Sequence, residues 1–285
     1  MDERIDISVI IPMYNAENYI VETIDSINKQ AKHGLKIEIL VVDDVSQDNS
    51  KNIVRNLNNK YIRMIELKKN GGTANARNIG IKEAKGEWIQ FMDSDDKISL
   101  DLYQKFEQVQ KPDFNCYLFS LIIEYKDYTL KQTINEIKDK RAFGHFGGVW
   151  NKFIRRDICI EFEGVSKQNE DTCFVIDMMI EKDLKCSLIK DAYYVYNRKN
   201  EQSKISNFNK KEYLKMYNYV YNKVDKCDDH TKMFILEIFV ALIFNPEMPF
   251  MMSLKIATKT LLRLFKYLPS VLVNQNRHYV TNIKY

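Results

Sequence analysis

The sequence predicts an α/β protein built on a Rossmann-like, mainly parallel central sheet with helices on both faces. Two observations carry this prediction. Strand-like and helix-like segments alternate through the first 96 residues, which is the pattern of β-α-β units. Two acidic clusters, residues 43–44 and 93–96, each directly follow a short apolar run rich in β-branched and aromatic residues. Both clusters therefore fall at the carboxyl ends of strands, where open α/β sheets bind their ligands.

The individual elements follow from hydrophobic periodicity and from turn residues. The first half predicts strands at residues 7–11, 37–42, 61–67 and 87–92. It predicts helices at residues 18–30 and 72–84, and a short helix that begins near Asp48, a plausible N-cap. After residue 96 the pattern loosens, with a helix at 100–109, a long strand at 114–124, a helix at 170–181 and a strand at 193–196. From residue 209 to near residue 270 the pattern is helical. We therefore expect a catalytic domain at residues 1–208 and a helical C-terminal region at 209–285.

Composition excludes several classes of protein. A net charge of +4 over 285 residues is too small to indicate nucleic-acid binding. The five cysteines form no CxxC pair, which disfavours a zinc site or a disulfide framework and fits a reducing cytosol. The N-terminus leads straight into a strand, and no uncharged apolar run reaches the ~18 residues of a transmembrane helix. We expect a cytoplasmic protein, and the oligomeric state stays open.

The C-terminal region carries a basic stripe made of Lys255, Lys259, Arg263 and Lys266, with leucines on the opposite side. Such an amphipathic helix can lie on an anionic membrane surface, such as the inner face of the cytoplasmic membrane. A surface helix that packs its apolar face on the core is the commoner explanation.

The end of the first strand, at Pro12, Tyr14 and Asn15, lacks the GxGxxG turn of a dinucleotide-binding fold. Pro12 has no N–H to donate to a ladder, so we expect it to end the strand. Tyr14 is placed to stack on a base, and packing on a neighbouring helix is the alternative.

Residues that follow the next strands have the chemistry of a nucleotide site. A carboxylate at Asp43 or Asp44 can accept the N3–H of uracil, and helix capping, the alternative, explains Asp48 but not this pair. The paired glycines at 71–72 allow close approach of a phosphate, and Arg77 in the following helix has the donors to reach a diphosphate. A solvated helical arginine is the alternative.

The D-x-D motif formed by Asp93, Ser94 and Asp95 can hold Mn²⁺ or Mg²⁺ when phosphate oxygens and water complete the octahedron. Glu170 and Asp171 begin a helix, where the dipole alone would stabilise acidic residues. A general base that activates an acceptor is the functional interpretation. Arg198 could pair with a leaving diphosphate.

In order and spacing these motifs resemble the family 2 glycosyltransferases, over roughly residues 5–206. The resemblance is carried by these segments: SVIIPMYN from Ser8, VVDDVSQD from Val41, ARNIG from Ala76, DSDD from Asp93, VWNK from Val149, ED from Glu170 and YNR from Tyr196. Two departures stand out: the family usually has glycine where Val45 stands, and Ser203 follows the late arginine at a looser spacing.

The resemblance implies a GT-A fold and an inverting, metal-dependent transfer of a sugar from a nucleotide-sugar donor, such as a UDP-sugar, to a saccharide or lipid-linked saccharide in surface polysaccharide assembly. It implies a donor site at Pro12, Tyr14, Asn15, Asp44, Arg77, Asp93, Ser94 and Arg198. It further implies Asp95 as the ligand of Mn²⁺ or Mg²⁺ and Asp171 as the base with Glu170 beside it. Trp150 and Asn151 would line the sugar or acceptor pocket.

Two alternatives stay open. A nucleotidyltransferase would carry a glycine-rich loop with Arg and Lys after the first strand, and this chain has Pro12–Asn15 there instead. A non-catalytic binding protein on the same fold would lack the metal aspartate or the base, and both Asp95 and Asp171 are present.

Overall fold

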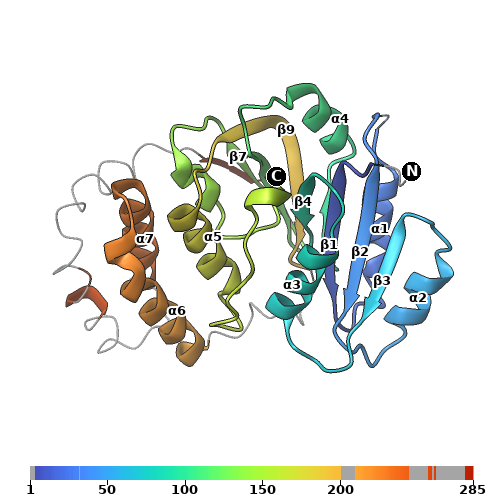
Figure 1. Ribbon diagram of the computed structural model, residues 1–285, viewed down its shortest axis with the longest axis horizontal. Helices are drawn as coiled ribbons and strands as arrows, with labels where there is room; N and C mark the ends of the chain where they lie inside the picture. Colours follow the sequence, from blue (N-terminus) through green and yellow to red (C-terminus); the bar gives the residue numbers. More distant parts are fainter. Residues whose placement is uncertain are drawn as a thin grey trace.

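The computed structural model describes residues 4–31, 33–199, 209–243, 256–258, 260 and 280–284. A single large sheet runs through the molecule, with helices on both faces (Figure 1). Its strands are β1 (Ile7–Met13), β2 (Ile37–Asp43), β3 (Ile62–Glu66), β4 (Trp88–Phe91), β5 (Lys97–Ile98), β6 (Cys116–Glu124), β7 (Thr129–Ile134), β8 (Lys152–Arg155), β9 (Cys186–Asn197) and β10 (Val280–Lys284). The α/β class that the sequence predicts is confirmed.

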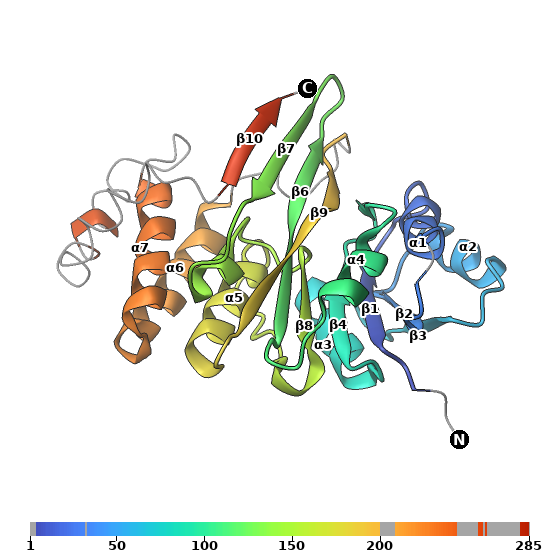
Figure 2. The same cartoon turned by 90° about the horizontal axis from the view of Figure 1, so that it is seen from above.

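The helices cover the two faces of this sheet. They are α1 (Ile20–Asn28), α2 (Ser50–Asn56), α3 (Thr73–Glu83), α4 (Leu102–Val109), α5 (Glu170–Glu181), α6 (Lys210–Lys223) and α7 (Asp229–Ile243), with short 3₁₀ segments η1 (Lys140–Gly144), η2 (Arg156–Ile158) and η4 (Val224–Lys226). Figure 2 shows α5, α6 and α7 together on one side of β6 and β8, with α4 and α1 on the other. Among the residues described, no helix is long and apolar enough to cross a membrane.

The sheet is half parallel and half antiparallel. Strands β3, β2, β1 and β4 are parallel neighbours, as the alternating pattern predicts. Beyond β4 the chain inserts β8 antiparallel to both β4 and β6, and β7 and β10 continue the antiparallel edge. β9 then pairs in parallel with β6 and antiparallel with β5. The parallel half places the carboxyl ends of β1, β2 and β4 at one edge, where the predicted site residues follow.

Two hydrophobic cores lie on opposite faces, as the period of two along a strand requires. In β1, Ile7, Val9 and Ile11 face the core beneath α1 and α4, whereas Ile10 faces the core beneath α3 and α5. The α1 residues at i, i+4 and i+7, Ile20, Ile24 and Ile27, are buried. This spacing is what makes residues 20–28 helical in this context.

The prediction that Pro12 ends the first strand is wrong. β1 continues to Met13, and Pro12 lies in register with Val42. The reason is the side on which its missing N–H would point. The backbone carbonyl of Ile10 points toward β4, where it accepts from the N–H of Met92. The backbone of Pro12, two residues later, points to the same side, but Pro12 lies beyond the end of β4. No ladder hydrogen bond is therefore lost.

The predicted helical C-terminal region contains α6 and α7, which pack against α5, and it also returns a strand, β10, to the sheet edge beside β7. The basic stripe of Lys255, Lys259, Arg263 and Lys266 lies outside the described residues. The division of the chain at residue 208 and contact with a membrane stay predictions.

Candidate active site

The loops that follow β1 and β2 are joined to each other by hydrogen bonds. The N–H of Asn15 donates to Ser46 Oγ at 3.0 Å, and the N–H of Gln47 donates to Asn15 Oδ1 at 2.8 Å. The Asp48 carboxylate accepts from the N–H of Glu17 at 3.0 Å. Asn15 thus braces the loop pair. Tyr14, beside it, is 49% exposed, so its ring is accessible at the carboxyl end of β1.

The sequence predicts Asp48 as the N-cap of α2, but the structure places the N-cap one residue later. The N-cap residue of α2 is Asn49, whose side chain makes no capping hydrogen bond. Asp48 instead accepts from the N–H of Ser50 at 3.0 Å. Burial alone would raise the pKa of Asp48, but the hydrogen bonds from Ser50 and Glu17 outweigh it and lower the pKa.

The Asp44 carboxylate is buried and holds the glycine loop. One oxygen accepts from the N–H of Gly71 at 2.7 Å, and the other accepts from the N–H of Gly72 at 2.8 Å. Gly72 has φ of 82°, a conformation that suits glycine, and it directly precedes α3. Asp43 accepts instead from the N–H of Ser46. The predicted base-binding residue is therefore also the anchor of the loop that starts α3.

Val45 stands where the resembled family usually has glycine, and its φ is 68°. The left-handed region costs an L-residue about 1–2 kcal/mol, and more crowding arises with a β-branched side chain. We expect Val45→Gly to raise the free energy of unfolding by about 0.5–1 kcal/mol, since the added entropy of glycine in the unfolded chain offsets part of the relief. Val45→Ala keeps the Cβ and should not reproduce this gain. Urea unfolding of the three proteins measures both effects, and a gain in the alanine variant alone would contradict the strain argument.

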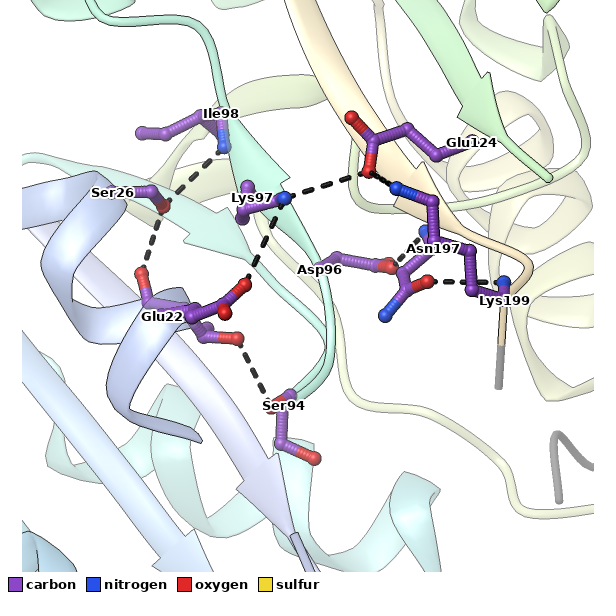
Figure 3. A network of polar contacts seen from close by, with 10 residues as sticks. Glu22, Ser26, Ser94, Asp96, Lys97, Ile98, Glu124, Asn197 and Lys199 are labelled. Atoms are coloured by element: carbon purple, nitrogen blue, oxygen red, sulfur yellow. Dashed lines mark hydrogen bonds and ion pairs between the residues drawn. The ribbon is translucent and has the colours of Figure 1, made fainter. Parts of the chain in front are cut away.

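The D-x-D loop is fixed from two sides, and Figure 3 shows Ser94 on the side of α1 and Asp96 on the side of Asn197. The Asp96 side chain is fully buried and accepts from the Tyr194 hydroxyl at 2.6 Å and from the N–H of Asn197 at 2.8 Å. Tyr194 also accepts from the N–H of Asp93 at 3.0 Å. The Ser94 carbonyl accepts from the Thr23 hydroxyl at 3.0 Å. Burial, then repulsion from Asp93 and Asp95, raises the pKa of Asp96 well above its usual range.

The predicted late arginine lies directly after β9, beyond this loop. The N–H of Arg198 donates to the Glu124 carbonyl at 2.8 Å, and its guanidinium lies 5.4 Å from the Tyr196 ring centroid. The Glu124 carboxylate pairs with Lys97 at 3.5 Å and with Lys199 at 2.8 Å (Figure 3). These contacts place a group of cations beside the D-x-D loop.

Arg77 joins the D-x-D loop to the start of α5. Its side chain is 3% exposed; Nη2 donates to Asp93 Oδ1 at 2.9 Å, and Nη1 donates to Asp171 Oδ1. Its guanidinium also packs over the Phe162 ring, 5.3 Å from the centroid. The sequence predicts that Arg77 reaches a diphosphate. In this structure both terminal nitrogens bind protein carboxylates, because α3 turns this side chain into the protein.

Asp171 combines burial with a cation. Burial raises the pKa of its carboxyl group, while Arg77 and the backbone N–H of Val149 oppose the rise; the net direction is upward. Its place in the first turn of α5 adds the favourable field of a helix N-terminus. A carboxylate whose pKa is moved toward neutrality is suited to accept a proton. Glu170 precedes it in the same turn and is partly buried.

Trp150 is the centre of an aromatic stack. Its ring is nearly parallel to Phe146 at 6.3 Å, Tyr196 at 5.9 Å and Tyr194 at 4.7 Å. Asn151, predicted with it to line the pocket, is fully buried: its Nδ2 donates to the Phe119 carbonyl at 3.0 Å, and its Oδ1 accepts from Lys152. Asn151 therefore supports the strand rather than presenting its amide to a sugar.

Tyr194, Asp96 and Phe162 position the site but were not singled out from the sequence. The strand signal at residues 193–196 contained Tyr194, yet nothing local indicates that its hydroxyl reaches the D-x-D loop. Asp96 is the acidic residue that directly follows the D-x-D motif. Its position directly before β5 is the feature from which a structural role could be predicted. Phe162 lies in an irregular segment, where periodicity gives no orientation.

The carboxylates of the D-x-D loop are the candidate ligands of a divalent metal. Among the described residues, no group of three or more His, Cys, Asp or Glu side chains is arranged to hold one. Asp93 and Asp95 nevertheless offer hard carboxylate oxygens at a strand end, and only one oxygen of Asp93 is used by Arg77. Mg²⁺ and Mn²⁺ commonly take one or two carboxylates, with substrate phosphates and water as the other ligands. The residues present fit such a shared site.

Comparison with known proteins agrees with this geometry. Residues 8–177 match the family described as Glycosyl transferase family 2. The chain is 30% identical over 212 residues to the minor teichoic acid biosynthesis protein GgaB of Bacillus subtilis (strain 168). The aligned region covers 70% of this chain and 23% of GgaB. This chain therefore spans less than a quarter of that relative.

Two solved structures show the same architecture. Staphylococcus aureus TarS 1-349 in complex with UDP-GlcNAc has a TM-score of 0.65 at 23% identity, covering 82% of this chain and 71% of TarS 1-349. The mannosyltransferase PcManGT from Pyrobaculum calidifontis, in complex with GDP-Man and Mn²⁺, has a TM-score of 0.53 at 15% identity, covering 97% of this chain and 77% of that chain. The chain belongs to glycosyl transferase family 2 and has the GT-A fold.

Proposed function

We propose that this protein transfers a sugar, with inversion, from a UDP-sugar to a hydroxyl of a saccharide or lipid-linked saccharide during synthesis of a bacterial cell-surface polymer. One observation carries the proposal. The guanidinium of Arg77 pairs with Asp93 in the D-x-D loop and with Asp171 at the start of α5. It therefore holds the loop that would bind the diphosphate next to a carboxylate suited to be a base. Leaving group and base must flank the anomeric carbon in such a reaction.

The protein's own residues would perform the following steps. The Asp44 carboxylate keeps lone pairs beyond those used by Gly71 and Gly72, so it can also accept uracil N3–H, with the exposed Tyr14 ring beside the base. Asp171 takes the proton of the acceptor hydroxyl. That oxygen then bonds to the anomeric carbon from the face opposite the diphosphate. The carbon–oxygen bond to the diphosphate breaks with its electron pair leaving on the phosphate oxygen, so an α-linked donor gives a β-linked product.

Asp95, with the free oxygen of Asp93, would hold a Mn²⁺ or Mg²⁺ that neutralises charge on the departing nucleoside diphosphate. The Mn²⁺ in the PcManGT complex supports this choice of metal. The UDP-GlcNAc in the TarS complex makes that nucleotide sugar the first donor to test. The teichoic acid role in the name of GgaB supports a cell-surface polymer as the product.

Calorimetric titration with UDP, with and without Mn²⁺, tests the donor site. We expect Mn²⁺ to tighten UDP binding, and Asp95→Ala to remove most of that gain, raising the Kd in Mn²⁺ by about 10-fold or more, because a direct carboxylate ligand is lost. Asp183→Ala, at an aspartate that is 86% exposed, is the matched control and should bind as wild type. UDP binding that ignores both the metal and Asp95→Ala would refute the metal assignment. No UDP binding under any condition would refute the uracil assignment to Asp44.

A further inference from the structure

Lys152, the first residue of β8, is a fully buried lysine. Its ammonium donates to the Gly148 carbonyl and, at 2.6 Å, to Asn151 Oδ1, and it lies 5.3 Å from the Phe143 ring centroid. These contacts are all with neutral groups. Burying an ammonium on neutral partners costs stability, and an apolar side chain of similar volume would avoid that cost. The arrangement therefore calls for an explanation other than packing.

The Gly148–Val149 peptide provides the link between Lys152 and the site. Its carbonyl accepts from the Lys152 ammonium, and its N–H, on Val149, interacts with the Asp171 carboxylate and favours the charged form. In a trans peptide the C=O and N–H point in opposite directions, so one planar unit lies between the ammonium and the carboxylate. A cation on the carbonyl polarises the peptide and strengthens its N–H as a donor.

We propose that Lys152 is a positioning residue for Asp171, acting through the Gly148–Val149 peptide to hold the carboxylate in place and ionised. This inference rests on the proposed function, in which Asp171 is the base. The ammonium fixes the peptide plane from within the core, and the N–H on the other side of that plane meets the carboxylate at the start of α5. The short loop of residues 148–151 is thereby tied at both ends, by Lys152 and by the Asn151 bond to Phe119.

The charges around Lys152 agree with this role. Burial lowers the pKa of Lys152 to about 8, while Cys116 on β6, Asp171 on α5 and Cys186 on β9 act to raise it. His145, in the loop after η1, has its pKa lowered to about 4 by burial and by Lys152, so it is neutral when Lys152 titrates. The ammonium form thus prevails at neutral pH and is lost as pH rises through about 8.

The kinetic test is Lys152→Met, measured as UDP release from UDP-GlcNAc with water as the acceptor. We expect the rate at neutral pH to fall about 10- to 100-fold, the scale for a misplaced catalytic group, and the acid limb of the rate profile to move to higher pH. The Kd of UDP in Mn²⁺ should stay within about threefold, because the donor residues are untouched. Lys223→Met is the matched control: it removes an ammonium that pairs with Asp177 on α5 at 2.6 Å and does not donate to this peptide. It should destabilise the fold without moving the pH profile.

A spectroscopic test keeps the inference falsifiable if Lys152→Met does not fold. In wild-type protein carrying [¹⁵N]valine, we expect the Val149 amide resonance to move as pH is taken through about 8, and to move again in Asp171→Asn. A Val149 amide that does not respond to either change overturns the proposal. So does a Lys152→Met enzyme with the wild-type pH profile while Asp171→Asn is inactive. An active Asp171→Asn enzyme would instead refute the proposed function.

Discussion

Replacing Asp171 with Asn should reduce UDP release from UDP-GlcNAc by about 10²- to 10⁴-fold, the contribution of a general base, while UDP still binds. Asn has nearly the same shape but cannot accept the acceptor's proton. Arg77 keeps its bond to Asp93, so the D-x-D loop retains its support in the variant. The measurement is the steady-state rate, paired with calorimetric titration of UDP in Mn²⁺. A variant that transferred sugar at the wild-type rate would show that Asp171 is not the base.

The pH dependence follows from the same carboxylate. Only the ionised form of a base is active, so the rate falls as pH drops through its pKa. Burial raises the pKa of Asp171 despite Arg77, and the acid limb of the wild-type profile should therefore lie above the range of an ordinary aspartate. Glu170→Gln removes a neighbouring carboxylate in the same helical turn and is the matched control. It should leave the acid limb where the wild-type enzyme has it.

The fold was predictable where short-range pattern and packing agree. Residues 7–11, 37–42 and 87–92 are apolar runs that end in polar clusters, and these became β1, β2 and β4. β7, with sequence TLKQTI, mixes polar and apolar residues, and the four-residue β8, KFIR, which pairs with β4 and β6, begins with a buried lysine. Such strands are defined by the neighbours with which they pair across the sheet, and no periodicity within the segment reveals them.

The site was predictable as a set of positions but less so as a set of contacts. Asp44 and Asp93 follow parallel strands whose ends meet at one edge, and α3 carries Arg77 to Asp93 and Asp171. Which partner each would choose depended on distant residues. Arg77 lies 94 positions from Asp171, and no local signal indicates that its guanidinium would be buried between two carboxylates. The same is true of Lys152, which the sequence showed only as part of the VWNK segment.

Arg77→Met should damage both activity and stability, because it leaves two partly buried carboxylates without their cation. Without Arg77 the pKa of Asp171 rises further, since the guanidinium is the largest influence that lowers it. The acid limb of the rate profile should move to higher pH, and the rate at neutral pH should fall about 10²-fold or more from lost base and lost geometry. The measurement is the pH–rate profile of the variant beside that of wild type, and an unshifted acid limb would contradict the role of Arg77 in setting the base.

The stability of Arg77→Met should itself depend on pH. At neutral pH we expect a loss of about 3 kcal/mol, the lower end for a broken buried pair, because Asp171 and Asp93 keep 21% and 30% of their side chains exposed. In the Arg77→Met protein, the raised pKa of Asp171 means that the folded state favours the protonated carboxyl group. The loss in the free energy of unfolding should therefore be largest above that pKa and should shrink as pH falls below it. Arg55→Met, at a half-exposed arginine whose ion-pair partner is Glu66 at 2.6 Å, should cost under about 1 kcal/mol. Urea unfolding at neutral and mildly acidic pH separates the two, and a loss in Arg77→Met that stays constant across this range would mean that packing of the guanidinium over Phe162, rather than its charge, sustains the site.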